Sequence, residues 1–277
     1  MNLNDLNEKI ISILKEEEIK EAELEAFYII EAVMKLSRPM FFIKKRDEVS
    51  EQDVSSCLAI AQKRSEHMPL QYILGTQEFM GLSFKVTPDV LIPRQDTEGL
   101  VEEVLKQVKP GIKVLDMCTG SGCIAVSVAK FAPNVQVSAA DISPKALEVA
   151  KENAATNQVQ INFIESDMFT EIREKYDMII SNPPYIKSQV VTTLMPEVRD
   201  YEPHLALDGK EDGLFFYRKL AKESGNFLTP GGMLCLEIGY DQGAEVAQLL
   251  KQQGFIQVRV EQDLCGLDRN VYGKLPE

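Results

Sequence analysis

The chain has 277 residues, with 30 basic and 43 acidic side chains and a formal net charge of −13. Such an acidic surface repels phosphate backbones and argues against an extended nucleic-acid footprint. The five cysteines include no C-x-x-C pair, and Cys and His do not cluster at zinc-ligand spacing, so neither a disulfide framework nor a metal site is predicted.

The N-terminal stretch is amphipathic and carries acids, which is unlike a signal peptide. No apolar run approaches the ~18 residues that a membrane span needs. The sequence therefore predicts a soluble, cytoplasmic protein without a membrane anchor, whose thiols stay reduced.

The first part of the chain is predicted to form helices, because apolar residues recur there at helical spacing. Ser50, with Asp53 three residues later, has the pattern of a capping box at the start of the third helix. A small helical domain over residues 1–69 is expected, of a kind that suits docking of a partner. The three predicted apolar stripes are Leu3, Leu6, Ile10, Ile13 and Leu14; Leu24, Phe27, Tyr28 and Met34; and Val54, Cys57, Leu58 and Ala61.

The helical spacing of apolar residues ends near Pro69, and residues 70–95 are predicted to link two domains. Within this stretch, residues 72–86 alternate β-prone segments with glycines and predict a β-hairpin. Asp96 or Thr97 is expected to cap the next helix, which runs to about Val108.

From residue 112 onward, strands alternate with helices, which predicts βαβ units and a mainly parallel sheet in an α/β domain over residues 96–277. Helices are expected to begin near Gly122, at Ser143, near Asp212 and near Gln242. The candidate strands are 113–117, 135–141, 161–165, 177–181, 233–238 and 255–261.

A glycine-rich turn follows the first of these strands, at Cys118, Thr119, Gly120, Ser121 and Gly122. Glycine allows a tight turn and a close approach of the backbone to a ligand. In a doubly wound sheet such a turn lies at the carboxyl ends of the strands, where ligands bind. Taken alone, the turn also resembles a dinucleotide fingerprint, or it is a purely structural turn.

Three acids accompany the turn. Asp116, just before the glycines, would repel a pyrophosphate but suits a ligand that bears an ammonium and a sulfonium. Asp141 ends the next strand, at about the distance where an acid grips ribose hydroxyls. Asp167 follows the third strand and either accepts a hydrogen bond from an adenine amine, with Met168 packed on the ring, or only caps a turn.

The most specific signal is Asn182-Pro183-Pro184-Tyr185 at the end of a buried strand. The two prolines lack N–H donors, so the local backbone offers carbonyls, and the Asn182 side chain adds another acceptor. The Asn182 and Pro183 oxygens can hold the two hydrogens of an NH2 group on an sp² carbon, while Tyr185 offers a flat face. The other interpretation is a rigid turn with Asn as an Asx-turn former.

The chemistry predicted for this motif is positioning rather than proton removal. The lone pair of the nitrogen would be aimed at a sulfonium methyl, and the methylated nitrogen would lose its proton late. His67 and His204 have no evident partner in the sequence and are expected to be structural or surface residues rather than bases.

The two motifs together resemble the class I amino-methyltransferases. Further segments resemble the protein-glutamine methyltransferases of the HemK/PrmC family, which modify bacterial release factors, and the likeness covers nearly the whole chain in family order. These segments are Gln-Tyr-Ile-Leu-Gly at 71–75, Ile-Pro-Arg-Gln-Asp-Thr-Glu at 92–98, Tyr-Glu-Pro at 201–203, Ala-Leu-Asp-Gly at 206–209, Asp-Gly-Leu at 212–214, Glu-Ile-Gly at 237–239 and residues 263–269.

The resemblance implies a seven-stranded, Rossmann-like methyltransferase sheet, a small N-terminal helical domain that docks a class 1 release factor, and a connecting β-hairpin. Its substrate would be the glutamine of the Gly-Gly-Gln loop, held by residues 182–185. S-adenosylmethionine, which leaves as S-adenosylhomocysteine, would be bound by Asp116, Cys118, Thr119, Gly120, Ser121, Gly122, Asp141, Asp167, Met168 and Asn182.

The chain departs from the family pattern in three places. Cys118 stands where glycine is frequent, Met168 where an aromatic residue is common, and Asp208-Gly209-Lys210 replaces a Gly-Gly pair. Three roles are open for Arg94 and Glu98 at this point: they line the site, they brace its lid, or they form a structural salt bridge.

Two other functions fit part of the pattern. A nucleic-acid methyltransferase acting on an exocyclic amine uses the same four-residue motif, but it needs stacking residues and a basic channel along the strand. The net charge and the absence of tryptophan argue against it, and no direct nucleic-acid binding is expected. A nucleotide-binding scaffold without turnover would not need an intact Asn-Pro-Pro-Tyr motif.

Overall fold

The computed structural model describes residues 1–277, which pack into two units. A helical unit comprises residues 1–75 together with residues 195–201, and a sheet unit comprises residues 76–194 and 202–277. None of the helices is both long and apolar enough to cross a bilayer.

The helical unit is built on amphipathic helices with one shared core. On α1 the predicted stripe is buried at Leu6, Ile10 and Leu14. The Ser50 cap of α4 is confirmed, since Ser50 Oγ accepts a hydrogen bond from Asp53 N at 3.1 Å; the Asp53 carboxylate accepts from the Ser50 hydroxyl at 2.7 Å instead of the backbone N–H that a capping box uses. The helices are α1 (Leu3–Glu16), α2 (Ala22–Met34), α3 (Arg38–Lys44), α4 (Glu51–Ser65), α5 (Leu70–Leu74) and, later in the chain, α10 (Pro196–Arg199).

The stripe predicted for α2 is only partly right, because Phe27 and Met34 pack against the core but do not form the buried face. The buried positions are Ala22, Ala26, Ile29 and Ile30, whereas Tyr28 is exposed. This helix packs against both α1 and α4. Small alanines allow two neighbouring helices to approach closely, so they take the inner face, and the larger aromatic side chains remain at the rim.

Residues 195–201 join the helical unit from far along the sequence. The guanidinium of Arg64, which is almost fully buried, lies 2.6 Å from Glu25 on α2 and 3.6 Å from Glu197 on α10. The Tyr201 hydroxyl donates to the backbone carbonyl of Glu66 at 2.7 Å. Nothing in the local pattern of the sequence indicated this packing.

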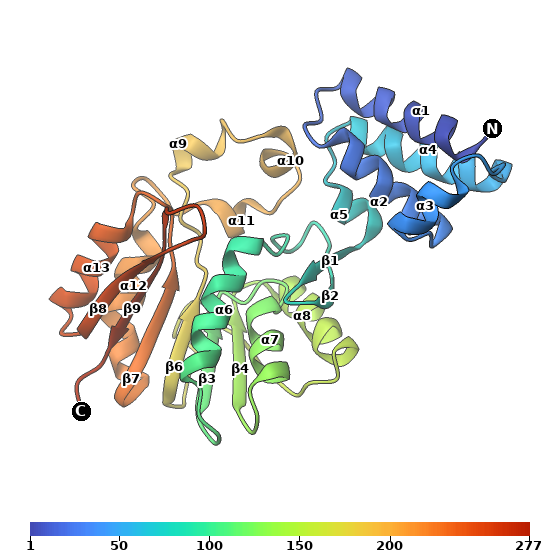
Figure 1. The fold of residues 1–277 in the computed structure, drawn as a ribbon. Coiled ribbons are helices and arrows are strands. Elements are labelled where there is room, and N and C mark those ends of the chain that lie inside the picture. The colour runs from blue at the N-terminus through green and yellow to red at the C-terminus, as the bar shows by residue number, and fades with distance from the viewer. The chain divides into compact units, whose positions relative to one another are not determined.

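The sheet unit contains seven strands in the order β5-β4-β3-β6-β7-β9-β8 (Figure 1). The first five in this order run parallel, and β9 is antiparallel to both of its neighbours. The strands are β3 (Lys113–Met117), β4 (Gln136–Asp141), β5 (Asn162–Glu165), β6 (Tyr176–Ser181), β7 (Leu228–Glu237), β8 (Ile256–Gln262) and β9 (Asp268–Lys274).

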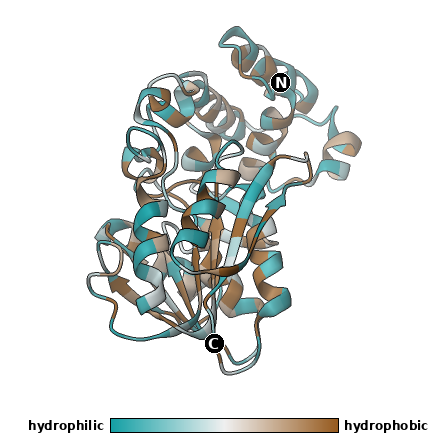
Figure 2. Cartoon of the chain, turned by 90° about the vertical axis from the view of Figure 1, so that its left-hand side faces the viewer, coloured by the Kyte–Doolittle hydropathy of each residue, from teal (hydrophilic) through white to brown (hydrophobic).

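Helices cover both faces of this sheet. Along β3, Val114 packs with the layer of α6, α7 and α8, and its neighbour Leu115 packs with the layer of α12 and α13. Hydrophobic residues accordingly fill the central strands, whereas the outer sides of the flanking helices are largely hydrophilic (Figure 2). The helices are α6 (Gln95–Gln107), α7 (Cys123–Phe131), α8 (Pro144–Thr156), α9 (Ser188–Val191), α11 (His204–Leu207), α12 (Phe215–Glu223), the 3-10 turn η1 (Ser224–Asn226) and α13 (Gly243–Gln252).

Two local predictions need correction near the first helix of this unit. The hairpin is present as β1 (Thr76–Phe79) and β2 (Leu82–Lys85), but it begins later than expected, because residues 70–74 form α5. Neither Asp96 nor Thr97 caps α6, whose N-cap is Arg94 and makes no side-chain cap bond. Thr97 is instead buried inside the first turn of the helix.

The order of the strands places two loops side by side. β3 pairs with β4 on one side and with β6 on the other, all parallel, so the carboxyl ends of the three strands meet at one edge. The chain leaves β3 toward β4 and leaves the adjacent strand β6 toward β7, in opposite directions along the sheet, which makes the β3/β6 boundary the kind of switch point where α/β sheets bind ligands.

Candidate active site

The glycine-rich turn after β3 depends on left-handed backbone at three positions. Cys118, Gly120 and Gly122 have φ angles of +63°, +55° and +80°. A Cβ added at Gly122 would lie 3.0 Å from the Ala150 Cβ of α8, so glycine is required there for conformation and for space. The turn therefore brings backbone N–H groups to the start of α7 without a side chain in the way.

Asp116 lies beneath this turn and is completely buried. Its Oδ2 accepts hydrogen bonds from Thr119 Oγ1 at 2.5 Å and from Ala125 N at 3.1 Å, and its Oδ1 has no partner. Burial raises the pKa of this carboxyl to about 7, although the two hydrogen bonds act in the opposite direction. Asp116 therefore braces both ends of the turn.

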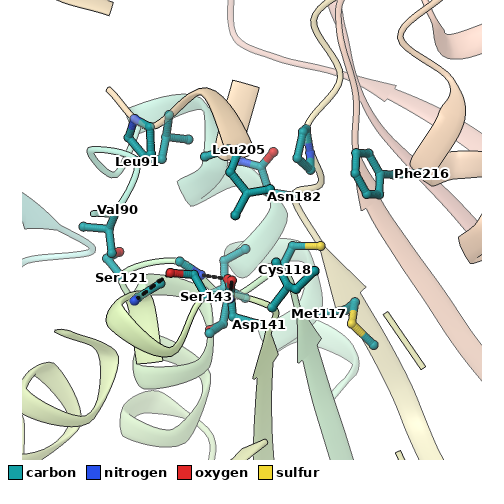
Figure 3. Close-up of a pocket in the computed structure, with 18 of the residues that line it drawn as sticks. Val90, Leu91, Met117, Cys118, Ser121, Asp141, Ser143, Asn182, Leu205 and Phe216 are labelled. Atoms are coloured by element: carbon teal, nitrogen blue, oxygen red, sulfur yellow. Dashed lines mark hydrogen bonds between the residues drawn. The ribbon is translucent and has the colours of Figure 1, made fainter. Parts of the chain in front are cut away.

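Asp141, at the end of β4, ties the turn to the neighbouring strand. Its Oδ2 accepts from Gly120 N and its Oδ1 accepts from Ser143 N, each at 2.9 Å. Burial raises the pKa of Asp141 despite these bonds. Figure 3 shows Asp141 between the glycine turn and Ser143, at the lower side of the pocket.

The Asn-Pro-Pro-Tyr loop begins where β6 ends. Ser181 Oγ donates to the Met117 carbonyl at 2.7 Å and so joins the ends of β6 and β3. The next residue, Asn182, donates from Nδ2 to Thr97 Oγ1 on α6 at 3.3 Å. The carbonyl of Tyr185 accepts from Gln242 Nε2 at 3.1 Å, and burial raises the pKa of the Tyr185 hydroxyl to about 12. The loop is thus held at both ends, and its tyrosine stays neutral.

A cavity of 420 Å³ lies between the two loops, within the range of small-molecule sites. Asp116, Gly122, Pro183 and Tyr185 lie outside its lining. The other predicted site residues are brought together in its wall, namely Cys118, Thr119, Gly120, Ser121, Asp141, Asp167, Met168, Asn182 and Pro184.

Two wall segments were not assigned to the site from the sequence. Val90 and Leu91 line the cavity before α6, and Leu205 and Phe216 line it after β6 (Figure 3). Both segments lie in or next to stretches that carry the family resemblance, which was the only available signal. Their apolar side chains supply the hydrophobic surface that a small-molecule site needs.

Arg94 and Glu98 differ in their surroundings. Arg94 lines the cavity and forms an ion pair with Glu202, which is 3% exposed and also accepts from Ile92 N at 3.4 Å. Glu98 accepts from Met80 N at 2.6 Å and so ties α6 to the hairpin, away from the cavity. Neither of the two histidines is in the wall.

The cavity carries charges of both signs. Asp89, Asp141 and Asp167 contribute carboxylates, and Arg94, Lys210 and Lys219 contribute cations. Lys219 Nζ lies 3.3 Å from Asp167 Oδ1. Such a mixed lining suits a zwitterionic ligand with an apolar part.

Comparison with known proteins places this architecture. A model of the methyltransferase small domain matches residues 95–201, and a model of the PrmC N-terminal domain matches residues 5–75. A release factor glutamine methyltransferase from Geobacter sulfurreducens is 40% identical and covers 95% of this chain and 93% of that protein. A second, from Clostridium acetobutylicum, is 38% identical over 98% of both.

The chain belongs to the release factor glutamine methyltransferase family.

Solved structures of lower identity show that the fold is shared more widely. A methyltransferase from Pyrococcus furiosus has a TM-score of 0.56 at 18% identity and covers 78% of this chain and 98% of that one. A 16S rRNA N2 G1207 methyltransferase from T. Thermophilus has a TM-score of 0.53 at 15% identity, over 72% and 49%. At these identities the likeness concerns the fold alone.

The three departures from the family pattern have one structural feature in common. Cys118, Met168 and Lys210 all adopt left-handed backbone, with φ angles of +63°, +52° and +72°. Each position costs on the order of 1 kcal/mol for a residue other than glycine. The sulfurs of Cys118 and Met168 lie 4.0 Å apart, and all three residues line the cavity. At Cys118 and Lys210 this member of the family therefore has a side chain in the wall where the family pattern has glycine, and at Met168 it has methionine where an aromatic residue is common.

Proposed function

We propose that this protein transfers a methyl group from S-adenosylmethionine to the side-chain amide nitrogen of the glutamine in the Gly-Gly-Gln loop of class 1 release factors. One observation carries the proposal: the glycine turn after β3 and the Asn-Pro-Pro-Tyr loop after β6 open into one cavity. The family names of the relatives at 38–40% identity support the substrate class.

The residues present fit S-adenosylmethionine. Asp141, aimed by two backbone N–H groups, is placed to accept from ribose hydroxyls, and Met168 offers an apolar face beside Asp167 for an adenine. In its ionised form, Asp116 beneath the turn, with Oδ1 unpartnered, adds negative potential for a cationic ligand. When bound, this cofactor supplies an electrophilic methyl group on a sulfonium.

The groups around Asn182 are suited to hold a primary amide. In this proposal the Asn182 Oδ1, in the cavity wall, and the Pro183 carbonyl accept the two amide hydrogens, and the neutral Tyr185 offers its ring as a packing face, although Pro183 and Tyr185 lie outside the cavity lining. Because both hydrogens are held, the nitrogen lone pair is directed and the gain comes from orientation. No histidine lines the cavity, in keeping with a proton that leaves late, after the nitrogen has become acidic.

In this proposal the first 69 residues dock the release factor, residues 70–95 link the two parts, and residues 96–277 carry out the reaction in the cytoplasm. The match of residues 5–75 to the PrmC N-terminal domain supports a conserved role for the first part. The net charge of −13 disfavours direct binding to a nucleic acid.

The test is transfer of a labelled methyl group to a purified release factor, with the modified residue located by peptide mass. We expect one methyl group on the glutamine of the Gly-Gly-Gln loop and none on a release factor in which that glutamine is alanine. Bound cofactor without transfer would move the acceptor to RNA, DNA or another protein.

A further inference from the structure

A buried acid lies next to Asn182 without lining the cavity. Glu237 is the last residue of β7 and is 1% exposed. Ser181 of β6 pairs in register with Leu236 of β7. Glu237 therefore lies opposite Asn182, the residue that directly follows β6. Thr97, on α6 and 2% exposed, completes the group and, unlike Glu237, also contributes to the cavity wall. Residues 140 positions apart in the chain thus meet behind the Asn-Pro-Pro-Tyr loop.

One hydrogen bond and two electrostatic effects on the Glu237 carboxyl connect these side chains. Asn182 Nδ2 donates to Thr97 Oγ1 at 3.3 Å. The side chains of Thr97 and Asn182 both lower the pKa of the buried Glu237 carboxyl, as nearby hydrogen-bond donors do. An ionised carboxylate only accepts, and a hydroxyl has one proton to give. When the Thr97 proton points to Glu237, the Thr97 oxygen is left to accept from Asn182.

Glu237 is energetically unfavourable at this buried position. The cation that lowers the pKa of Glu237 is Arg269, whose guanidinium is already bound at 3.0 Å by Asp263 and at 3.3 Å by Asp96. The second oxygen of Glu237, Oε2, has no hydrogen-bond partner. A buried carboxylate with so little compensation destabilises the fold, so its presence beside a reactive loop points to a functional role.

We infer that Glu237, acting through Thr97, is a positioning residue that keeps the Asn182 side-chain amide with Nδ2 inward and Oδ1 toward the bound substrate amide. This inference rests on the proposed function, because it concerns the acceptor atom for the glutamine NH2 group. If the Asn182 amide turned over, its NH2 group would face the NH2 group of the substrate, and two donors would meet. Neither Thr97 nor Glu237 is required to touch the reacting atoms.

Protonation of Glu237 reverses this arrangement. A neutral carboxyl can donate to Thr97, and the Thr97 hydroxyl is then free to donate to Asn182 Oδ1, which takes that oxygen away from the substrate. Burial raises the pKa of Glu237 to about 7, with Arg269 lowering it and Asp96 raising it. The turnover rate should therefore fall as the pH drops through the neutral range.

The titration of Glu237 can be distinguished from that of the groups around it. Besides Asp96 on α6 and Arg269 on β9, the groups that face Glu237 are Cys123 on α7, Tyr185 after β6 and Tyr217 on α12. Burial raises the pKa of each of these last three, so all three stay neutral near pH 7. Asp116 also has a pKa of about 7. Because Asp116 braces the glycine turn, its protonation should change the affinity for the cofactor, which is measured separately from kcat.

The first experiment compares three variants by kcat and KM for a purified release factor and by calorimetric affinity for S-adenosylmethionine. Thr97→Val removes the hydroxyl at constant shape, and Thr97→Ser restores it. The control is Thr229→Val, which removes a hydroxyl that donates to Asp177 at 2.9 Å, between the same two strands near their amino-terminal ends.

We expect Thr97→Val to lower kcat about 10- to 100-fold, as misorientation at a reacting group does, with KM and cofactor affinity within about twofold. Thr97→Ser should recover most of the loss, and Thr229→Val should have the kcat of the wild type. An unchanged kcat in Thr97→Val, or an equal loss of kcat and cofactor affinity, would overturn the inference.

The second experiment does not depend on the folding of Thr97→Val. Glu237→Gln has the same shape but cannot titrate, so the fall of kcat between pH 8 and pH 6 at saturating cofactor should be reduced or lost in this variant. A fall identical to that of the wild type would contradict the role of Glu237. If the wild type binds cofactor but transfers no methyl group to the release factor, the proposed function itself is overturned; normal wild-type transfer with an unaffected Thr97→Val overturns only the inference.

Discussion

The two loops that border the cavity are held in different ways, and a buried acid with a pKa near 7 lies behind each of them. Below the glycine turn, Asp116 bonds to a backbone N–H and to a hydroxyl of the turn itself, within nine residues of sequence. Behind the Asn-Pro-Pro-Tyr loop, Glu237 acts on side chains that come from other elements. The first acid maintains the shape of a loop, and the second maintains the orientation of one amide. Similar burial and pKa thus serve two different purposes.

The separation of roles between the two loops is tested most directly at Asn182. Asn182→Ala removes the acceptor but leaves the glycine turn and Asp141 in place, so methyl transfer should fall about 100- to 1000-fold, the loss typical of a deleted electrostatic contact in a reacting site. Cofactor affinity, measured by calorimetry, should remain close to that of the wild type. Equal losses of transfer and of cofactor affinity would show that the two loops do not act separately.

Asp141 provides the reverse case. Asp141→Ala removes the carboxylate that accepts from Gly120 and Ser143, and it should weaken cofactor affinity about 10- to 100-fold, as lost charged hydrogen bonds do. The value of kcat at saturating cofactor should change much less. Steady-state kinetics at several cofactor concentrations separate the two effects, and a loss confined to kcat would assign Asp141 to the chemical step instead.

Asp116 sharpens the comparison through pH. Because burial raises its pKa from 3.8 to about 7, the folded state binds this proton more tightly than the unfolded state. The stabilisation is complete below pH 4 and is lost as the pH rises to about 7. Between pH 5 and pH 7 the loss amounts to about 2 kcal/mol at most, from 1.36 kcal/mol per unit.

Asp116→Asn should therefore lose less stability than the wild type when the pH is raised from 5 to 8, as measured by urea unfolding at several pH values. Glu237→Gln should reduce the same slope, since its carboxyl is raised in the same direction. The two variants are expected to differ in catalysis: the pH dependence of kcat at saturating cofactor should follow Glu237 alone.

The smallest effect is expected at Gly120. Its φ of +55° strains any other residue, but an added Cβ would meet nothing within 4 Å. Gly120→Ala should therefore lower the free energy of unfolding by about 1 kcal/mol, the left-handed penalty alone. At Gly122, where the added Cβ lies 3.0 Å from Ala150, the loss measured by urea unfolding should be larger. Equal losses at both positions would mean that α8 moves away freely.

The local sequence determined most of the elements that form the site. The strand ends at Met117 and Ser181, the glycine turn and the Ser50 and Ser143 helix caps follow from residues close together in the chain, because turns, caps and buried strands are encoded by near neighbours. The family resemblance added the seventh strand. The pattern of residues 268–274 did not indicate it, and β9 is defined by its pairing with both β7 and β8.

Only the tertiary structure decided which side chains meet. The sequence suggested that Thr97 was a helix cap, but the fold places it beside Asn182, 85 residues away. Arg94 had no assigned role from the sequence, and the fold places it beside Glu202, 108 residues away. The same holds for residues 195–201, which pack with helices near the start of the chain. Periodicity and motif spacing describe contacts along one element, whereas these contacts depend on strand order and on the burial of polar groups that need partners from other elements.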